Sequence, residues 1–442
     1  MVRTLESLHS EYKARTPRSM EQWERGKQTM PGGIIKGAYW KSPHPLYIDH
    51  ASGCMLYDLD GNEYVDYANH HSATLLGHSH PDVVAAIHKE LDRGIAFGNP
   101  TALEAEISEE IVARVPSIEK VRFSNSGTES SLHASRMIRA ATGRRKIAKF
   151  EGAYHGSNDA LEHSTNPALD AAGSIESPSV VPAHKGMSEG SEDEIVILPY
   201  SDRETVDLIL REHKDEIAGV FFDGRPGMLD VSDDFASFLR DITKDLGMKL
   251  VVDEVVSFRT GPAGYQGLAG IQPDITIFGK VVGGGMPVGA IGGSAEMMDM
   301  LDNTGHPTGI TQSGTFSGNN LTLAAGLATL RALTPEVYAH LDSIGQRLAQ
   351  GLDQAYADAG IPCQVLQRGS VVNAYLTDRK VSDYRSFMTS DTATTTRINL
   401  ALLLKGYNLG TAPMEFMLSS PLTDKHIDGF LEALSEVLAE ED

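Results

Sequence analysis

Seven short apolar runs between residues 120 and 293 constrain the fold of this chain more than any other feature. They read KVRFS, RKIAKF, EIVILPY, AGVFFD, KLVVDEV, DITIFG and VGAIGG, and stretches with helical periodicity, such as 129–142 and 203–216, lie between several of them. This alternation predicts a mostly parallel sheet. Runs that are apolar on both faces predict strands covered by helices on each side. We therefore expect an α/β fold here.

The two ends of the chain show other patterns. Residues 1–30 predict a polar amphipathic helix that ends at Pro-Gly-Gly. Residues 45–67 contain short β-rich runs separated by Ser-Gly and Asp-Gly pairs, which predicts a small antiparallel meander. Helical patterns with a few short strands follow residue 330. We expect three parts: an N-terminal segment over 1–100, a large α/β domain over 101–330 and a small C-terminal α+β domain over 331–442.

Composition excludes several classes of function. The formal net charge is −22, so nucleic acid and anionic membrane surfaces would be repelled. Cys54 and Cys363 lie far apart without metal-ligand spacing, which argues against a disulfide framework or a metal site. The N-terminus lacks the apolar core of a signal peptide, and no apolar run approaches the ~20 residues of a membrane span. We expect a soluble, cytoplasmic protein with no nucleic-acid or membrane partner.

One lysine follows the run DITIFG and precedes three consecutive glycines, in FGKVVGGGMP. The stretch is not a P-loop, because Asp274 and Val281 stand where Gly and Ser or Thr are needed. It is not a dinucleotide-binding turn either, because Val288 replaces the third glycine. A lysine desolvated at a strand end has a lowered pKa, and its neutral amine can attack a carbonyl. Lys280 is therefore a candidate nucleophile, with a lysine on a turn surface as the alternative.

The sequence NSGTE follows the run KVRFS and precedes a helical pattern. Ser126 and Glu129 have the spacing of a capping box, which predicts a helix N-terminus. Backbone amides at such a turn bind phosphate favourably. Gly127 and Thr128, with Ser126, are therefore candidate phosphate-binding residues, and a plain helix cap is the alternative.

Two further strand ends carry candidate residues. FEGAYHG follows KIAKF, and the ring of Tyr154 could stack on a flat cofactor or pack in the core. KLVVDEV brings Asp253 to the end of a buried strand, where a carboxylate needs a cationic or strong donor partner. A protonated pyridine nitrogen is such a partner, and a structural salt bridge or helix cap is the alternative.

All these candidates lie at predicted carboxyl ends of strands in one sheet, where such folds bind ligands. A phosphate turn, an aromatic ring, a carboxylate and an amine together predict pyridoxal 5'-phosphate as the cofactor. Lys280 would form the Schiff base, and Asp253 would keep the pyridine nitrogen protonated. Gly127 and Thr128 would hold the phosphate.

NSGTE, FEGAYHG, VVDEV, FGKVVGGGMPVGA and SGTFSGNN, in this order and spacing, resemble the class III aminotransferases. The resemblance runs from residue 31 to about residue 420, and it is closest to the branch of glutamate-1-semialdehyde aminomutases and β-amino acid aminotransferases. It implies the fold-type-I pyridoxal-phosphate transferase fold. That fold has a large α/β domain with a mostly parallel seven-stranded sheet, and a small α+β domain built from N- and C-terminal segments.

The resemblance also implies roles for particular residues. Val255 would pack on one face of the cofactor ring and Tyr154 on the other, with Ser126 and His155 as further cofactor contacts. Thr315, in SGTFSGN, would reach the phosphate bound by the neighbouring subunit. This implies a homodimer with active sites at the subunit interface, in keeping with the prevalence of two-fold homo-oligomers.

Several positions depart from the family pattern. Relatives commonly have Glu-Pro where this chain reads FFDGRPGM, so Asp223 could keep the carboxylate while Arg225 lies either in the pocket or on the surface. Relatives that act on β-amino acids have arginine where Lys36 falls, and lysine lacks the bidentate fork for a carboxylate. No arginine follows Arg397, where some relatives bind an acid. His71 replaces an aromatic residue and is a candidate substrate contact, a proton carrier or a structural histidine.

We therefore expect a transaminase that moves an amino group from an amine or amino acid to a keto or aldehyde acceptor, through a Lys280 Schiff base and pyridoxamine phosphate. The absent arginine anchors favour a primary amine, an amino ketone or an unusual β-amino acid as substrate. An intramolecular aminomutase or a racemase using the same lysine is the nearest alternative, and residues 163–194 would then be a lid rather than a surface loop. A non-catalytic cofactor-binding protein would not require both Lys280 and Asp253.

Overall fold

A computed structural model describes residues 3–304, 309–410 and 414–440 of the chain. By their internal contacts the residues form two compact units. Unit 1 comprises Met1–His80, Ala339–Lys380 and Thr389–Asp442, and unit 2 comprises Pro81–Tyr338 and Val381–Met388.

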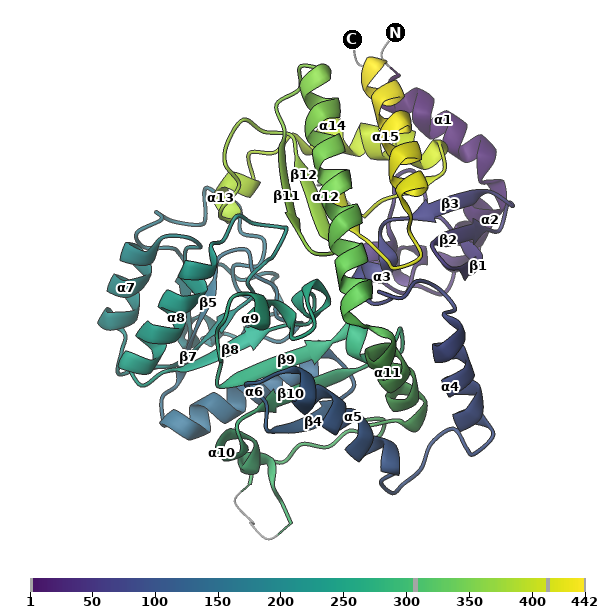
Figure 1. Cartoon of the computed structure of the whole chain (residues 1–442). Coiled ribbons are helices and arrows are strands. Elements are labelled where there is room, and N and C mark those ends of the chain that lie inside the picture. The colour runs from purple at the N-terminus through teal and green to yellow at the C-terminus, as the bar shows by residue number, and fades with distance from the viewer. Residues whose placement is uncertain (1–2, 305–308, 411–413, 441–442) are drawn as a thin grey trace. The chain divides into compact units, whose positions relative to one another are not determined.

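Unit 2 is built around a seven-stranded sheet with the strand order β4-β10-β9-β8-β7-β5-β6 (Figure 1). Strand β10 is antiparallel to both neighbours, and the other neighbouring pairs are parallel. The strands are β4 (Lys120–Ser124), β5 (Lys146–Phe150), β6 (Ile195–Leu198), β7 (Ile217–Phe222), β8 (Lys249–Asp253), β9 (Ile275–Gly279) and β10 (Gly289–Gly293). Each overlaps one of the seven apolar runs, so the predicted mostly parallel sheet is confirmed.

Helices cover both faces of this sheet. The helices of unit 2 are α4 (Pro81–Leu91), α5 (Ala102–Arg114), α6 (Gly127–Thr142), α7 (Arg203–Glu212), α8 (Asp233–Asp245), α9 (Gly264–Leu268), α10 (Ala295–Met298), α11 (Asn320–Ala332) and α13 (Tyr384–Phe387). On one face, Met137 of α6 packs with Ile277 of β9. On the other face, Leu327 of α11 packs with Phe278. Successive residues of β9 thus face opposite helix layers, which explains why this run is apolar throughout.

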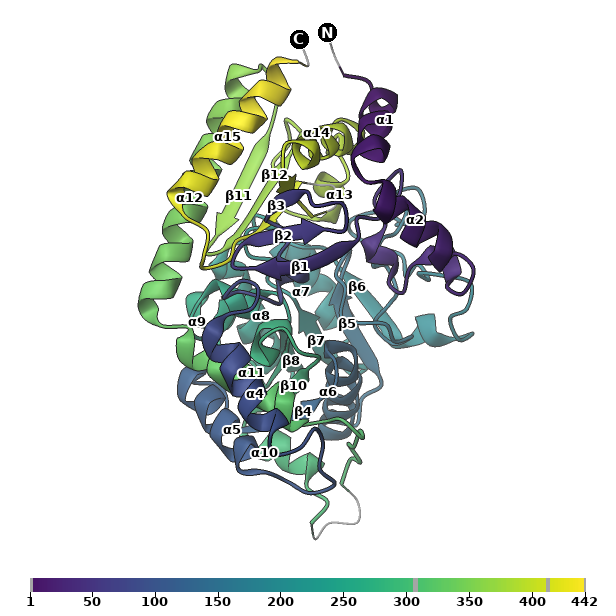
Figure 2. The ribbon, with the colours of Figure 1, turned by 90° about the vertical axis from the view of Figure 1, so that its right-hand side faces the viewer.

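Unit 1 contains a four-stranded sheet, β1-β2-β3-β13, and a three-stranded sheet, β11-β12-β14 (Figure 2). The predicted antiparallel meander is formed by β1 to β3, and β13 adds to it as a strand parallel to β3. The strands are β1 (Ile48–Ser52), β2 (Met55–Asp58), β3 (Glu63–Asp66), β11 (Gln364–Arg368), β12 (Val371–Tyr375), β13 (Tyr407–Asn408) and β14 (Met414–Met417). The helices are α1 (Leu5–Arg15), α2 (Pro17–Gly26), α3 (Asn69–Ser72), α14 (Thr392–Leu404) and α15 (Asp424–Ala439), together with most of α12 (Pro335–Asp358).

The single N-terminal helix expected from the sequence is wrong. The structure has two helices, because α1 ends at Arg15 and α2 begins at Pro17. Proline lacks the backbone N–H of a helix interior and its ring clashes with the preceding turn, so it is tolerated only in the first turn. The hydroxyl of Thr16, between the two helices, donates to the carbonyl of Tyr12 at 2.6 Å.

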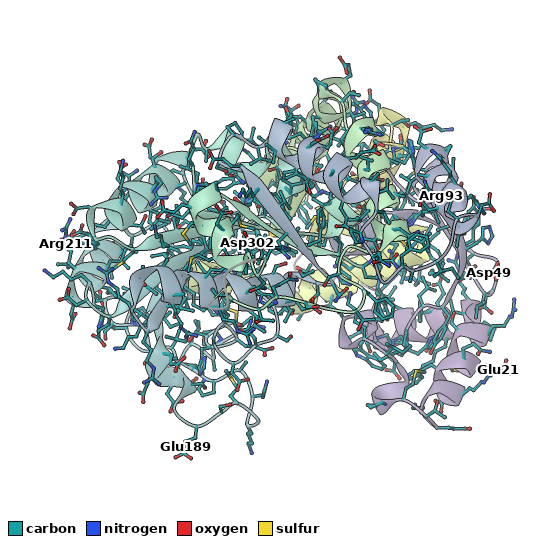
Figure 3. All side chains as sticks on the ribbon, turned by 90° about the horizontal axis from the view of Figure 1, so that it is seen from below. Glu21, Asp49, Arg93, Glu189, Arg211 and Asp302 are labelled. Atoms are coloured by element: carbon teal, nitrogen blue, oxygen red, sulfur yellow. The ribbon has the colours of Figure 1, made fainter. Side chains whose placement is uncertain are left out.

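The segment between β5 and β6 is largely irregular, as predicted, with turns, bends, an isolated bridge between Gly173 and Pro178 and a short 3-10 helix at Ser191–Glu194. Glu189 in this segment and Arg211 on α7 point outward from the ribbon (Figure 3). Within residues 3–304, 309–410 and 414–440, no helix combines the length and the apolar character that crossing a membrane requires.

Candidate active site

Four of the predicted site segments begin at one edge of the sheet in unit 2. Strand β5 is parallel to β7, β7 to β8 and β8 to β9, so all four point the same way. Strand β4 points this way too, because β10 is antiparallel to both β4 and β9. Their carboxyl ends therefore share an edge. NSGTE follows β4, FEGAYHG overlaps the end of β5, VVDEV overlaps the end of β8, and Lys280 follows β9.

The NSGTE turn opens α6. The hydroxyl of Ser126, the N-cap residue, accepts from the backbone N–H of Glu129 at 3.2 Å. The carboxylate of Glu129 accepts from the N–H of Asn125 at 2.8 Å, one residue before the position that a capping box requires. A Cβ placed on Gly127 would lie 3.0 Å from Val255. The turn thus presents a helix N-terminus, which favours anions, beside Val255.

His155 and Asp253 form a buried pair. Nδ1 of His155 lies 2.8 Å from Oδ2 of Asp253, and Oδ1 of Asp253 accepts from the N–H of Val255 at 3.0 Å. The two residues are 1% and 6% exposed. Asp253 is therefore held by the ring of His155 and by a backbone donor two residues further along the chain.

Lys280 begins a short 3-10 turn, Lys280–Gly283, directly after β9. Its φ is 50°, a left-handed conformation that costs roughly 1–2 kcal/mol for a residue with a Cβ. A Cβ on the preceding Gly279 would lie 3.2 Å from Val255. Val255 thus lies against both Gly127 and Gly279, and it connects the start of α6 with the segment that carries the half-buried Lys280.

Tyr154 is not a core residue, because 52% of it is exposed. Its hydroxyl lies 3.2 Å from that of Ser157, and the N–H of Ser157 donates to Oγ1 of Thr128 at 3.2 Å. Gly156 has a φ of 94°, and a Cβ there would lie 2.6 Å from Cα of Thr128. The FEGAYHG segment is therefore held closely against the NSGTE turn.

Arg225 is half-buried and lines a small cavity of about 150 Å³ together with Tyr154 and Tyr384. Its Nη2 donates to the carbonyl of Gly152 at 2.5 Å, and its Nε lies 3.4 Å from Oδ2 of Asp223. Burial raises the pKa of the Asp223 carboxyl, although the Arg225 charge opposes this shift. The structure thus places Arg225 beside the FEGAYHG segment rather than on the outer surface.

The other predicted site residues lie elsewhere. Lys36, in unit 1, is exposed, and its Nζ lies 5.2 Å from the ring centroid of Tyr39. His71, also in unit 1, lines a cavity of about 470 Å³ within that unit. Thr315, in unit 2, is exposed, and a Cβ on the neighbouring Gly314 would lie 2.7 Å from Nδ2 of Asn125.

Sequence reasoning missed a buried lysine next to the site. Nζ of Lys149, in β5, donates to the backbone carbonyls of Ala153, Leu161 and His163 at 2.8, 2.9 and 2.5 Å. Burial, followed by repulsion from Arg225, lowers the pKa of Lys149 to about 7. The only sequence signal was a lysine inside the apolar run KIAKF. These hydrogen bonds from Lys149 hold both ends of the segment 153–163 against β5.

A buried glutamate was missed as well. Both carboxylate oxygens of Glu254 accept hydrogen bonds, from Ser257, from the N–H of Tyr265 at 3.1 Å and from the N–H of Gln266 at 2.8 Å. Burial raises its pKa to about 7, and these donors reduce the shift. Through these hydrogen bonds Glu254, the residue after Asp253, holds the start of α9 in place.

Comparison with known proteins identifies the family to which this chain belongs. The family model described as Aminotransferase class-III matches residues 37–438. A glutamate-1-semialdehyde 2,1-aminomutase from Heliobacterium modesticaldum is 38% identical over 428 residues, which cover 95% of this chain and 96% of that protein.

Solved structures of similar proteins include aminotransferases. An omega-transaminase from Sphaerobacter thermophilus is 36% identical with a TM-score of 0.91, and the match covers 96% of this chain and 97% of that one. A beta-phenylalanine aminotransferase from Variovorax paradoxus is 32% identical with a TM-score of 0.88, covering 98% and 96%.

Proposed function

The chain belongs to the class III aminotransferases, which act on small molecules and use pyridoxal 5'-phosphate, and we propose that it is a transaminase. It moves an amino group from an amine or amino acid donor to a keto or aldehyde acceptor. When bound, the cofactor supplies an electron-withdrawing ring for the carbon that carries the amino group. The residues of the chain bind this group, orient it and move protons.

The single observation that carries this proposal is the close approach of Val255 to both Gly127 and Gly279, where an added Cβ would lie 3.0 and 3.2 Å from Val255. It joins an anion-binding helix N-terminus, a fixed carboxylate and a strained lysine at one sheet edge. These features fit pyridoxal 5'-phosphate: Gly127, Thr128 and Ser126 would hold its phosphate, and Asp253 would face its ring nitrogen. Val255 and Tyr154 would contact the ring, and His155 would hold Asp253 in place.

Lys280 is the proposed catalytic residue. The left-handed backbone conformation of Lys280 raises the free energy of the folded chain, and packing alone does not require it. Such strain is typical of functional positions. Nζ of Lys280 would take the proton from the amine-bearing carbon of the substrate as general base and would then donate that proton as general acid.

A homodimer is part of this proposal. Thr315 and Phe316 are exposed, Phe316 by 65%, in a segment that lies beside Asn125 of the NSGTE turn. An exposed aromatic ring next to a phosphate turn suits a subunit interface. Thr315 would reach the phosphate site of the partner.

The aminomutase is the second candidate, because the relative from Heliobacterium modesticaldum is 38% identical over nearly the whole chain. Solved transaminases that share 36% and 32% of their residues with this chain support the transaminase to a similar degree, so the experiment below decides between the two.

The two candidates differ in their need for an acceptor. The cofactor-loaded enzyme should be incubated with a panel of amines and of α- and β-amino acids, with and without pyruvate, and the amino and carbonyl products measured. Acceptor-dependent transfer supports the transaminase. Isomerisation of glutamate-1-semialdehyde without an acceptor would instead establish the aminomutase, and racemisation of an amino acid would establish the racemase.

Lys280→Ala should lose all such turnover, and Lys244→Ala, which removes an exposed lysine at the end of α8 in the same unit, should retain it. Equal turnover by both variants would contradict the role of Lys280.

A further inference from the structure

Arg385 lies on the short helix α13 and joins two other segments of unit 2. Its Nε and Nη2 donate to the two carboxylate oxygens of Glu151 at 2.9 and 3.1 Å. Its Nη1 donates to the carbonyl of Gly173 at 3.0 Å. Nη2 also donates to the carbonyls of Ala172 and Ser174, both at 3.2 Å. A guanidinium group has five donors in one plane, so this single side chain holds both segments.

Glu151, in the FEGAYHG segment, depends on Arg385 for its charge balance. Only 4% of Glu151 is exposed. A buried carboxylate is costly without a cation, and removal of one partner of such a pair leaves the other charge uncompensated. The two hydrogen bonds also fix the direction of the carboxylate, because the planar fork of arginine matches its two oxygens. Arg385 therefore determines where Glu151 lies.

The backbone that follows Glu151 packs against the same helix. Gly152 has a φ of 76°, and a Cβ at this position would lie 2.3 Å from the ring of Tyr384. The segment that carries α13 is itself anchored in unit 2, because the N–H of Asp230 donates to the carbonyl of Val381 at 2.9 Å. Glu151 and Gly152 thus lie against a helix whose own position is fixed.

The next residues along the chain are the ones proposed for the cofactor. The ring of Tyr154 would contact the cofactor, and Tyr154 shares the wall of the cavity of about 150 Å³ with Tyr384. His155 holds Asp253, with Nδ1 2.8 Å from Oδ2. Because Glu151 precedes both Tyr154 and His155 by only a few residues, a displacement of Glu151 would move the aromatic ring and the partner of Asp253 together.

We infer that Arg385 is a positioning residue for the cofactor site: by holding Glu151, it sets where Tyr154 and His155 lie. In this role Arg385 acts through Glu151 and does not itself contact the cofactor. The two residues are 234 positions apart in sequence, so only the folded chain brings them together. The inference rests on the proposed function, because it concerns the site for pyridoxal 5'-phosphate.

Arg114, on α5, provides a matched control. Its Nε donates to Oε1 of Glu110 at 2.8 Å, and its Nη1 and Nη2 donate to the carbonyls of Leu333 and Leu330. Its side chain is 16% exposed, compared with 25% for that of Arg385, so the two arginines are similarly buried. None of these partners belongs to the FEGAYHG segment. Arg114→Gln should therefore cost stability without affecting the cofactor.

The first test compares the two variants in the full-length protein. Equilibrium dialysis measures the affinity for pyridoxal 5'-phosphate, and visible circular dichroism at saturating cofactor reports the orientation of the bound ring. Arg385→Gln should weaken binding about tenfold, within the coupling that residues of one ion-pair network show, and should change the dichroism. Arg114→Gln should lower the thermal midpoint and change neither. Glu151→Gln combined with Arg385→Gln should weaken binding no further than Arg385→Gln alone, because the two residues act as one pair.

The second test needs no cofactor. Hydrogen exchange over residues 153–157 of the cofactor-free protein should be faster in Arg385→Gln than in wild type and unchanged in Arg114→Gln. Glu151→Gln removes the charge from the other side of the pair, should also speed this exchange, and keeps the inference testable if Arg385→Gln folds poorly.

The outcomes separate this inference from the proposed function. If wild type binds the cofactor, and Arg385→Gln matches Arg114→Gln in affinity, dichroism and exchange, the role of Arg385 is overturned and the proposed function stands. A wild type that binds no pyridoxal 5'-phosphate would overturn the proposed function, and with it the role of Arg385 in the cofactor site.

Discussion

Nδ1 of His155 lies 2.8 Å from Oδ2 of Asp253, with both side chains buried. His155→Phe would leave Asp253 with the N–H of Val255 as its remaining donor among these contacts. Losing a hydrogen bond to a charged group should weaken binding of pyridoxal 5'-phosphate about ten- to hundredfold. Equilibrium dialysis followed by cofactor absorbance measures this. His213→Phe, at the end of α7, is the control and should bind normally, and normal binding by His155→Phe would disprove the role of the pair.

Lys149 should stabilise the segment that follows β5. Lys149→Met would leave the carbonyls of Ala153, Leu161 and His163 without this donor. Each unsatisfied buried group costs ~1–3 kcal/mol, so the thermal midpoint should fall clearly and protease should cut residues 151–165 faster. Lys146→Met in the same strand removes only a surface pair with Glu216, worth ~0–1 kcal/mol, and serves as the control. Equal midpoints for the two variants would refute this prediction.

Gly289 should tolerate no side chain. A Cβ at this position would collide with the carbonyl oxygen of Ser126 and the hydroxyl of Ser124. Gly289→Ala should therefore displace the start of α6, lower the stability by ~1–3 kcal/mol and weaken cofactor binding. A Cβ on Gly98 would meet open space, so Gly98→Ala should change neither the thermal midpoint nor the cofactor spectrum. An unperturbed cofactor spectrum in Gly289→Ala would be incompatible with the close approach.

Glu254 should give the stability a distinctive dependence on pH. Burial raises its folded-state pKa to about 7 from the ordinary 4.5, so the folded state binds more protons between these values. Its contribution to stability is complete below pH 4.5 and is lost as the pH rises to 7. One pKa unit corresponds to ~1.4 kcal/mol, so the loss is about 3 kcal/mol.

The measurement is the thermal midpoint of wild type and of Glu254→Gln across this pH range. Glutamine cannot titrate, so the advantage of wild type over the variant should shrink from pH 4.5 to 7 and then stay constant. A constant difference over the whole range would show that Glu254 keeps its ordinary pKa.

The sequence predicted the strands of unit 2 because each coincides with a short, mostly apolar run. It could not predict the pairing of His155 with Asp253. His155 follows β5 and Asp253 ends β8, and β7 lies between these strands in the sheet. Strand order depends on how helices cross over, which local patterns do not contain.

Contacts between distant parts of the chain in unit 1 could not be predicted for a similar reason. Lys41 contacts Asn408, which is 367 residues away in sequence. Pro17 marks the break between α1 and α2, because proline is tolerated only in the first turn of a helix. Lys149 could not be predicted as a buried charge, because the carbonyls that accept its hydrogen bonds come from the loop after the strand.

The parallel pairing of β13 with β3 also bears on how the protein is made. Asp66 and Asn408, in adjacent positions of this sheet, are 342 residues apart in sequence. While the ribosome elongates the chain, the meander of β1 to β3 must wait with an open strand edge until the C-terminal segment emerges. Unit 2 lies almost wholly between these segments, so it can fold first, and the N-terminal strands are the part of the nascent protein that most needs chaperone protection.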